Sequence, residues 1–185
     1  RLPQPLGLDL RDSSDSGLEL LRKRIENEEA KLKLAIKHTS PSQWIVMESE
    51  SGSQSIYPTG AAADAIFRPV YGATWKDKHY EVTRDIDGKV CCVAEATLCS
   101  GGTDYERFEG RRYMGRFVKT ERDLIAGAFE NLKSRALRSV FGLGFRTLEE
   151  FAQLGLDPAK MKRRAEFQDH GADASVGSVA VVAWG

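Results

Sequence analysis

The stretch KTERDLIAGAFENLKSRALRSVFGLG, residues 119–144, predicts one long helix with a marked start and end. Thr120 is a suitable N-cap, Asp123 three residues later makes a weak version of the capping box, and Gly142 and Gly144 stop the helix. Apolar residues recur at helical spacing and predict one buried side: Ile125, Ala128, Phe129, Leu132, Ala136 and Val140. The opposite side carries four polar residues: Asn131, Ser134, Arg135 and Arg138. Such a side is either a solvated surface or a wall that binds a polyanion.

Composition places the chain among ordinary globular proteins. It has 185 residues, of which 41% are hydrophobic and 29% charged, typical of one soluble domain with appendages. Because no apolar run reaches the length of a membrane span and no secretory signal opens the chain, we expect a cytoplasmic protein. Cys91, Cys92 and Cys99 crowd one strand-like segment without the spacing of a disulfide framework, so we expect buried thiols in a reducing compartment.

Charge is unevenly distributed along a chain whose net charge is zero. Residues 107–146 hold ten basic side chains against four acidic ones, a local balance of +6. Residues 1–58 hold eight basic side chains against nine acidic ones, a balance of −1. Such asymmetry indicates either a localised basic surface on a neutral molecule or arginines that are paired within the fold.

The N-terminal part predicts a flexible arm over residues 1–16 and a helix over residues 17–37. Glu28 and Glu29 interrupt the apolar stripe of that helix. An interrupted stripe suits a contact between subunits better than a continuous core, so we expect the helix and arm to pack on neighbouring copies. Removal of residues 1–37 should then give smaller oligomers.

The rest of the chain predicts an α+β fold, in which an antiparallel three-stranded β-meander packs on the long helix with flanking helices. The meander strands are expected at 74–84, 89–99 and 103–108, with turns at Asp87-Gly88 and Gly101-Gly102 and a loop at 110–117. Before it, we expect a strand or turn at 42–47, a Ser/Gly-rich loop at 48–55, and a helix at 60–67 that Thr59 caps and that ends before Pro69. After the long helix, we expect a helix from the capping box Thr147–Glu150 to Leu154, a helix at 161–167 after Asp157-Pro158, and a C-terminal strand at 176–184. The expected divisions are an arm at 1–16, a domain at 17–156 and an extension at 157–185.

A β-β-β meander followed by a helix ending in Lys-x-Arg-Ala-Leu-Arg-x-x-Phe-Gly resembles the single-strand annealing proteins, which include phage recombinases and the eukaryotic homologous-recombination annealing protein. The matching residues are Lys133, Arg135, Ala136, Leu137, Arg138, Phe141 and Gly142. The stretches HTSPSQWIVM, YPTGAAADAI and LGFRTLEEFAQLGL are similar to phage members of the group, and together the resemblance spans about residues 37–156. Glu121 and Asp123 depart from the family pattern. Because they place acidic side chains in the first turn of the helix, we do not expect that turn to bind phosphate.

The resemblance implies a function in homologous recombination. Proteins of this group form rings or helical filaments, hold single-stranded DNA in a basic groove, and anneal it to a complementary strand without ATP. It therefore implies single-stranded DNA and further copies of the chain as partners, with a single-strand-binding protein or an exonuclease as additional candidates. It implies no cofactor.

Candidate DNA-binding residues follow from the basic segment. They are Arg107, Arg111, Arg112, Arg116, Lys119, Lys133, Arg135 and Arg138, together with Tyr105 and Tyr113. Arg135 and Arg138 share the polar side of the helix and are expected to reach successive phosphates, whereas Lys133 points aside, toward a second strand or another subunit. The loop before the helix carries Arg111, Arg112 and Arg116, which are expected to close over the same DNA strand.

Aromatic side chains near these cations have two open interpretations. Tyr105 and Tyr113 are expected either to stack on bases or to pack against the sheet, while Phe108 and Phe117 are expected in the core.

Other chemistry finds little support in the sequence. No phosphate-binding G-x-x-x-x-G-K-[ST] motif occurs. Asp85, Asp87 and Glu95 near Lys89 resemble a metal nuclease only weakly, because Asp87 belongs to a predicted turn and no Glu-x-Lys triplet follows. The three histidines are scattered: His38, His79 and His170. We therefore expect neither catalysis nor a bound metal.

Two alternatives remain open on the sequence. One is a module that binds double-stranded nucleic acid, since such modules share the order helix, three strands, helix. The other is a structural assembly protein whose basic surface contacts another subunit.

Overall fold

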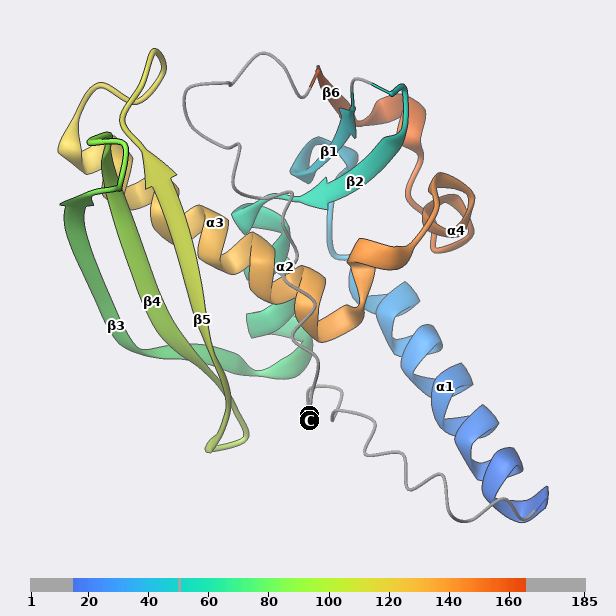
Figure 1. Cartoon of the computed structure of the whole chain (residues 1–185). Helices are drawn as coiled ribbons and strands as arrows, with labels where there is room; N and C mark the ends of the chain where they lie inside the picture. The colour runs from blue at the N-terminus through green and yellow to red at the C-terminus, as the bar shows by residue number, and fades with distance from the viewer. Residues whose placement is uncertain (1–14, 50, 166–185) are drawn as a thin grey trace.

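The computed structural model describes residues 15–49 and 51–165 and confirms the α+β class (Figure 1). One sheet is the predicted antiparallel meander, with β3 (Ala73–Arg84), β4 (Val90–Ser100) and β5 (Thr103–Tyr113) in that order. The long helix α3 (Glu121–Phe141) packs on the inner face of this meander. Figure 1 shows a second, smaller sheet on the other side of α3.

The meander turns form where the sequence places them, but β5 runs further than expected. The Asp85 carboxylate accepts hydrogen bonds from the backbone of Asp87 and Lys89, and Gly88 takes a positive φ of 76°. Arg112 and Tyr113 pair with β4 through Cys92 and Cys91. The expected loop at 110–117 is therefore wrong in its first half, because strand pairing continues through Gly110 to Tyr113.

Gly110 lies where β5 comes so close to α3 that there is no room for a side chain. A Cβ atom built there would lie 2.2 Å from the carbonyl oxygen of Ala128 and 2.2 Å from the backbone nitrogen of Leu132. The glycine marks a close approach of β5 to α3 rather than a break in the strand.

Helix α3 begins and ends as predicted, but its buried side is broader. The Thr120 hydroxyl accepts a hydrogen bond from the Asp123 backbone at 3.1 Å, and Gly142 ends the helix with φ 61°. The buried residues are Leu124, Ala128, Leu132, Ala136, Leu137, Val140 and Phe141. Ile125 and Phe129 are only partly buried. The C-terminal half is buried more widely because a second helix packs there: α2 (Gly60–Tyr71) places Tyr71 with its ring centroid 5.4 Å from that of Phe141.

The small sheet has the order β2-β1-β6. β1 (Trp44–Glu48) pairs antiparallel with β2 (Gln54–Pro58) and parallel with β6 (Lys162–Ala165). The loop expected at 48–55 thus includes the start of β2.

The helix expected at 161–167 is also wrong. Asp157 and Pro158 do start a helical turn, with the Asp157 carboxylate accepting from the Ala159 backbone, but it is a single 3₁₀ turn, η3 (Pro158–Lys160). Met161 is then buried, and the next residues pair with β1. Tertiary strand pairing here overrides the local helix signal.

The remaining helices agree with the sequence except at one proline. α4 (Leu148–Gln153) has the predicted capping box between Thr147 and Glu150. α2 continues through Pro69 to Tyr71 and ends at Gly72, so the expected end before Pro69 is wrong; the proline removes one backbone hydrogen bond in the last turn of the helix. Thr59 stands at the N-cap of α2, but its hydroxyl donates to the Gln43 carbonyl oxygen at 2.9 Å.

Helix α1 (Asp15–Ile36) extends away from the rest of the molecule (Figure 1). Its last turns bury Leu32, Ala35 and Ile36, whereas Ile25 and Leu34 are 48% and 59% exposed. Asp15 and Ser16, expected in the arm, already belong to this helix. The rest of the expected arm and the expected strand at 176–184 lie outside the described residues.

Within the described part of the chain, no helix has the length and apolar character needed to span a bilayer.

Candidate nucleic-acid interface

The polar side of α3, formed by Asn131, Ser134, Arg135 and Arg138, mostly contacts the chain itself. Asn131 Nδ2 donates to the Arg111 carbonyl oxygen of β5 at 2.7 Å. Ser134 Oγ donates to the Pro58 carbonyl oxygen of β2 at 2.6 Å. This side of the helix therefore joins α3 to an edge strand of each sheet.

Arg138 belongs to the same joint. Its guanidinium carbon lies 4.1 Å from the centroid of the Tyr57 ring on β2. A Cβ built at Gly144 would lie 3.2 Å from Nη2 of Arg138, so the glycine leaves room for the side chain. The Nε atom is buried without a hydrogen-bond partner among the described residues. Arg138 is thus held mainly by packing and by its contact with the aromatic ring.

Arg135 is the exposed member of the polar side. Its guanidinium makes no ion pair, hydrogen bond or ring contact with another residue that the structure describes. Although Arg135 and Arg138 share a side of the helix as predicted, the structure gives them different environments.

Lys133 is engaged within the chain. Its ammonium bonds Asp64 of α2 at 2.7 Å and Glu130 at 3.0 Å. Burial disfavours the charged form, but the hydrogen bonds to the two carboxylates outweigh it and raise the pKa of Lys133. The charge of Lys133 is therefore matched at the contact between α2 and α3.

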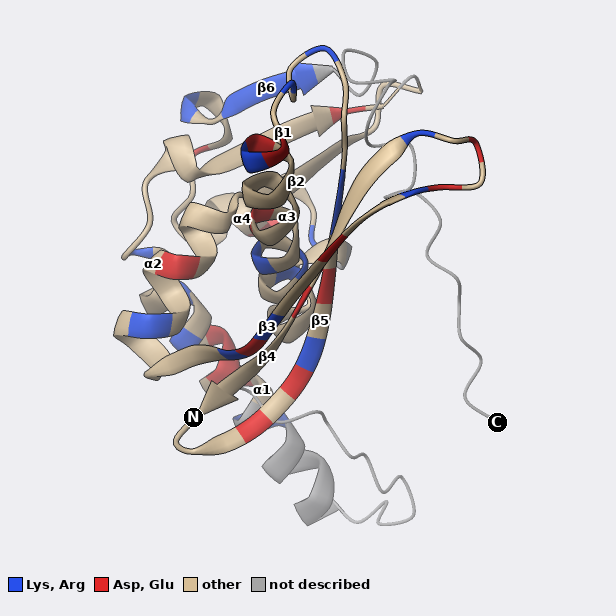
Figure 2. Ribbon diagram, turned by 90° about the vertical axis from the view of Figure 1, so that its left-hand side faces the viewer, with Lys and Arg blue, Asp and Glu red and all other residues tan. Residues whose placement is uncertain are grey.

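Cations on the outer face of the meander, the face turned away from α3, are also matched. Arg107 Nη2 lies 2.5 Å from Glu95 Oε2, and Arg111 Nη2 lies 3.7 Å from Glu109 Oε1. A hydrogen bond to Tyr113 is the main cause that raises the pKa of Arg111. Figure 2, which looks at the meander from its β3 edge, shows acidic and basic positions interspersed along β5. Two of the ten basic side chains in residues 107–146 are therefore matched by carboxylates on this face.

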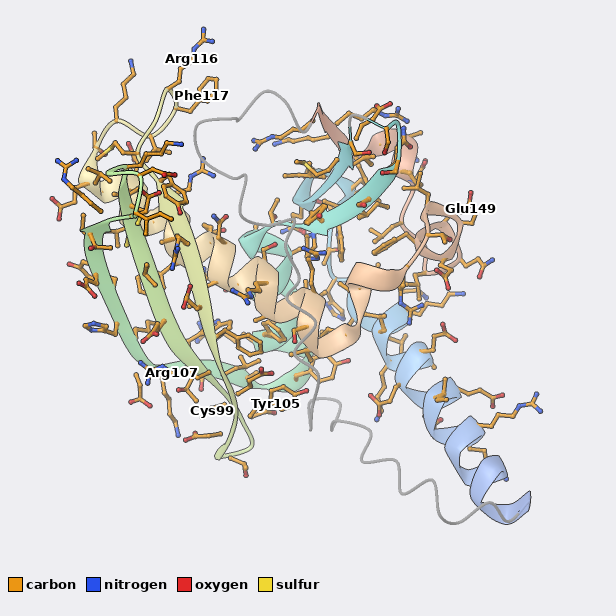
Figure 3. The ribbon with its side chains drawn as sticks, in the orientation of Figure 1. Cys99, Tyr105, Arg107, Arg116, Phe117 and Glu149 are labelled. Carbon is orange, nitrogen blue, oxygen red and sulfur yellow. The ribbon has the colours of Figure 1, made fainter. Side chains whose placement is uncertain are left out.

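The structure separates two of the predicted residues from the others. Figure 3 shows Tyr105 and Arg107 at the lower end of the meander, far from Arg116. The six residue steps from Arg107 to Tyr113 correspond to about 20 Å of extended strand. Tyr105 is partly buried against the core, and this burial raises its pKa. Of the two interpretations given for Tyr105, stacking on a base or packing against the sheet, the structure agrees with packing.

Three predicted residues lie near the start of α3. Arg112 lies across the helix, because a Cβ at Gly127 would come within 2.9 Å of its Cγ. Arg116 and Lys119 are exposed in the β5–α3 turn, residues 114–120. Neither forms an ion pair with a carboxylate among the described residues.

Phe117, expected in the core, is 67% exposed at the tip of the β5–α3 turn. The prediction is wrong because Val118, only 6% exposed, takes the buried position instead. Phe108, by contrast, is buried as expected, at 5% exposed.

Further basic residues escaped the sequence reasoning. Lys162, Arg163 and Arg164 are exposed on β6, and Arg122 is exposed in the first turn of α3. β6 and the β5–α3 turn lie at the same end of the molecule in both Figure 1 and Figure 2. The sequence Lys-Arg-Arg at 162–164 could have indicated a basic surface here. Because this segment was expected to be a helix, its position at the edge of a sheet was not predicted.

Tyr57 was also missed. It lies in β2, of which only the first two residues fell in the loop expected at 48–55, and for which no strand was expected. Its contact with Arg138 joins positions 81 residues apart, which no local pattern reveals.

The described residues offer no metal site, since no group of three or more His, Cys, Asp or Glu side chains there could hold an ion. All three cysteines are buried, as expected, and burial raises the pKa of Cys91 and Cys92.

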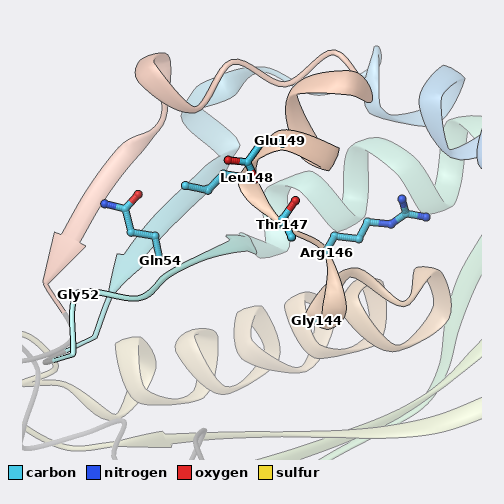
Figure 4. Close-up of a pocket in the computed structure, with 7 residues that line it drawn as sticks. All are labelled: Gly52, Gln54, Gly144, Arg146, Thr147, Leu148 and Glu149. Carbon is cyan, nitrogen blue, oxygen red and sulfur yellow. The ribbon is translucent and has the colours of Figure 1, made fainter.

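A shallow depression of about 460 Å³ lies beside the start of β2 (Figure 4). It is lined by Gly52, Gln54, Gly144, Arg146, Thr147, Leu148 and Glu149. Arg146 Nη1 lies 3.1 Å from Glu29 of α1, so the cation that lines the depression is already paired. The depression is therefore a weaker candidate than the exposed cations.

No model of a known protein family matches the chain, and no curated protein matches it.

Proposed function

We propose that this protein binds single-stranded DNA and anneals complementary strands without ATP. The observation that carries the proposal is a group of exposed cations that have no carboxylate partner among the described residues. The group, called here the open cations, consists of Arg116, Lys119, Arg122 and Arg135. Elsewhere on the meander and α3, cations such as Arg107 and Lys133 are paired.

The sequence supports the same function. The motif from Lys133 to Gly142 and its flanking stretches resemble single-strand annealing proteins, and the confirmed order of three meander strands followed by a long helix agrees with that resemblance.

The chemistry of the open cations suits a polyanion. Arginine and lysine bind phosphates with little regard to base sequence, and such binding weakens steeply with salt. Annealing requires the bases to stay accessible, so contacts to the backbone serve it better than contacts to base edges.

The test is an annealing assay with complementary labelled oligonucleotides in the absence of nucleotide, joined to binding measurements at several salt concentrations. The combined variant Arg116→Ala, Lys119→Ala and Arg122→Ala should weaken binding of all sequences. Its salt slope should fall by roughly 0.7 for each lost phosphate contact on a single strand. Arg107→Ala is the matched control, because this exposed arginine is already paired with Glu95.

Other outcomes would support the alternatives. Preference for duplex over single strands would favour a double-stranded nucleic-acid-binding module. No binding to either would leave an assembly protein.

We further propose that the protein forms homo-oligomers in which α1 contacts a neighbouring copy. Ile25 and Leu34 are exposed along this extended helix. Removing residues 1–27 keeps the buried Leu32, Ala35 and Ile36, and should give smaller species in light scattering. An unchanged oligomer would contradict this arrangement.

A further inference from the structure

We propose that Phe117 stacks on an unpaired base of a single strand, while Arg116 and Lys119 bind the phosphates on either side of it. This inference rests on the proposed function and assigns an aromatic contact to it. Figure 3 shows Arg116 and Phe117 projecting together from the end of the molecule, away from both sheets.

The tip that carries Phe117 is well anchored. Gly115 and Val118 exchange two backbone hydrogen bonds, of 3.1 and 3.2 Å, which close a tight turn around Arg116 and Phe117. The Met114 backbone donates to the Val90 carbonyl oxygen at 2.9 Å, and the Val118 side chain is buried. The ring is therefore presented by a structured turn, which lowers the conformational entropy lost when a ligand binds.

The ring is also accessible and already lies beside a cation. Phe117 is 67% exposed, and the Arg116 guanidinium carbon lies 5.6 Å from its centroid. Proteins that bind single strands commonly combine an aromatic face for a base with nearby cations for the backbone. Both parts occur here within four residues, because Lys119 is exposed just beyond the buried Val118.

A flat, charged ligand fits this tip better than an apolar surface does. The other large exposed apolar side chains among the described residues lie elsewhere, on α1, on β3 and at the β3–β4 turn: Ile25, Leu34, Tyr80, Val82 and Ile86. Within the β5–α3 turn, Phe117 stands as a single exposed ring among cations. One ring offers little area for a protein or membrane contact but a complete face for one base.

The test measures binding of the full chain to single-stranded oligonucleotides that contain 2-aminopurine, whose fluorescence reports stacking. Phe117→Ala should weaken binding about five- to a hundredfold. Phe117→Trp should keep the affinity, because it keeps an aromatic face, whereas Phe117→Leu should not. Ile86→Ala is the control, since Ile86 is a fully exposed apolar residue at another turn of the same sheet.

Salt dependence separates the ring from its neighbours. Phe117→Ala should leave the salt slope unchanged, because stacking releases no counterions. Arg116→Ala with Lys119→Ala should reduce the slope by roughly 0.7 for each residue.

Several results would overturn the inference. They are an unchanged affinity in Phe117→Ala, full affinity in Phe117→Leu, loss of the oligomer in Phe117→Ala, or loss of binding to anionic vesicles without any change on DNA. If the wild-type chain binds single strands and any of these occurs, this inference alone fails. If the wild-type chain binds no single strands at any salt concentration, the proposed function fails, and this inference with it.

Discussion

β5 and β2, the strands on either side of the polar side of α3, meet that helix in different ways. β5 approaches through Gly110, where the absence of a side chain brings strand and helix backbones into direct contact. β2 approaches through polar groups, with Ser134 bonded to the Pro58 carbonyl oxygen and Arg138 lying over Tyr57. The first joint depends mainly on shape, to which Asn131 adds one hydrogen bond, and the second depends on two side chains.

The difference explains why a basic, polar helix side is not by itself a binding surface. Without β2, Ser134, Arg135 and Arg138 would all face outward. With β2 in place, Ser134 and Arg138 serve the fold, and Arg135 is left exposed. Pairing within the chain, rather than the local excess of positive charge, decides which cations are available to a ligand.

The shape-dependent joint should give the largest effect on stability. In Gly110→Ala the new methyl would overlap the backbone at Ala128 and Leu132, and neither strand nor helix can relieve this by a side-chain rotation. We expect the free energy of unfolding to fall by about 3 kcal/mol or more, measured by urea denaturation. Gly115→Ala is the control, because a Cβ there meets nothing within 4 Å. Equal stability of the two variants would show that β5 and α3 do not meet so closely.

The polar joint should give a smaller effect. Arg138→Ala removes the contact with the Tyr57 ring and the packing beside Gly144, and we expect a loss of about 2 kcal/mol. A double-mutant cycle with Tyr57→Leu should show coupling of about 1 kcal/mol, whereas Tyr57→Phe, which keeps the ring, should preserve it. Absence of coupling would mean that the ring does not hold the arginine, and Arg138 would return as a candidate for phosphate binding.

The sequence predicts the elements of the contact between β5 and α3, but it does not predict the strand β2 of the other contact. The meander, α3 and their caps follow from periodicity, turn residues and capping boxes, which are local signals. The position of β2 depends on the pairing of Trp44–Glu48 with Gln54–Pro58, and one partner lies in a Ser/Gly-rich segment that reads as a loop. The local sequence of β6 likewise predicts a helix, and only the pairing with β1, which is distant in the sequence, makes it a strand.

The candidate site is less predictable than the fold for the same reason. The basic residues of the segment 107–138 could be named from the sequence, but their carboxylate partners are set by strand register and helix packing. Glu95 on β4 meets Arg107 diagonally from the adjacent strand, and Asp64 of α2 meets Lys133. The exposure of Phe117 depends on which of two adjacent apolar residues, Phe117 or Val118, turns inward.

Ser134→Ala, at the same contact between α3 and β2, should lower the free energy of unfolding less than Arg138→Ala does. It leaves the Pro58 carbonyl oxygen without its 2.6 Å hydrogen bond, which costs about 1 kcal/mol, and the higher helix propensity of alanine returns about half of that. We expect a net loss of about 0.5 kcal/mol by thermal denaturation. Ser139→Ala, at an exposed position of the same helix, should instead be neutral or slightly stabilising.

Arg135→Ala should have the smallest effect on stability and the clearest effect on function. Its side chain is exposed and makes no contact that another described residue would lose, so the free energy of unfolding should change by less than about 0.5 kcal/mol. If Arg135 binds a phosphate, the variant should bind every single-stranded sequence more weakly, and the salt slope should fall by roughly 0.7. Arg138→Ala is the opposite case, because it should lower stability at a nearly constant salt slope. Should both variants lower the slope, the joint at β2 opens when DNA binds; should Arg135→Ala leave affinity and slope intact, the strand must follow the β5–α3 turn without reaching the polar side of α3.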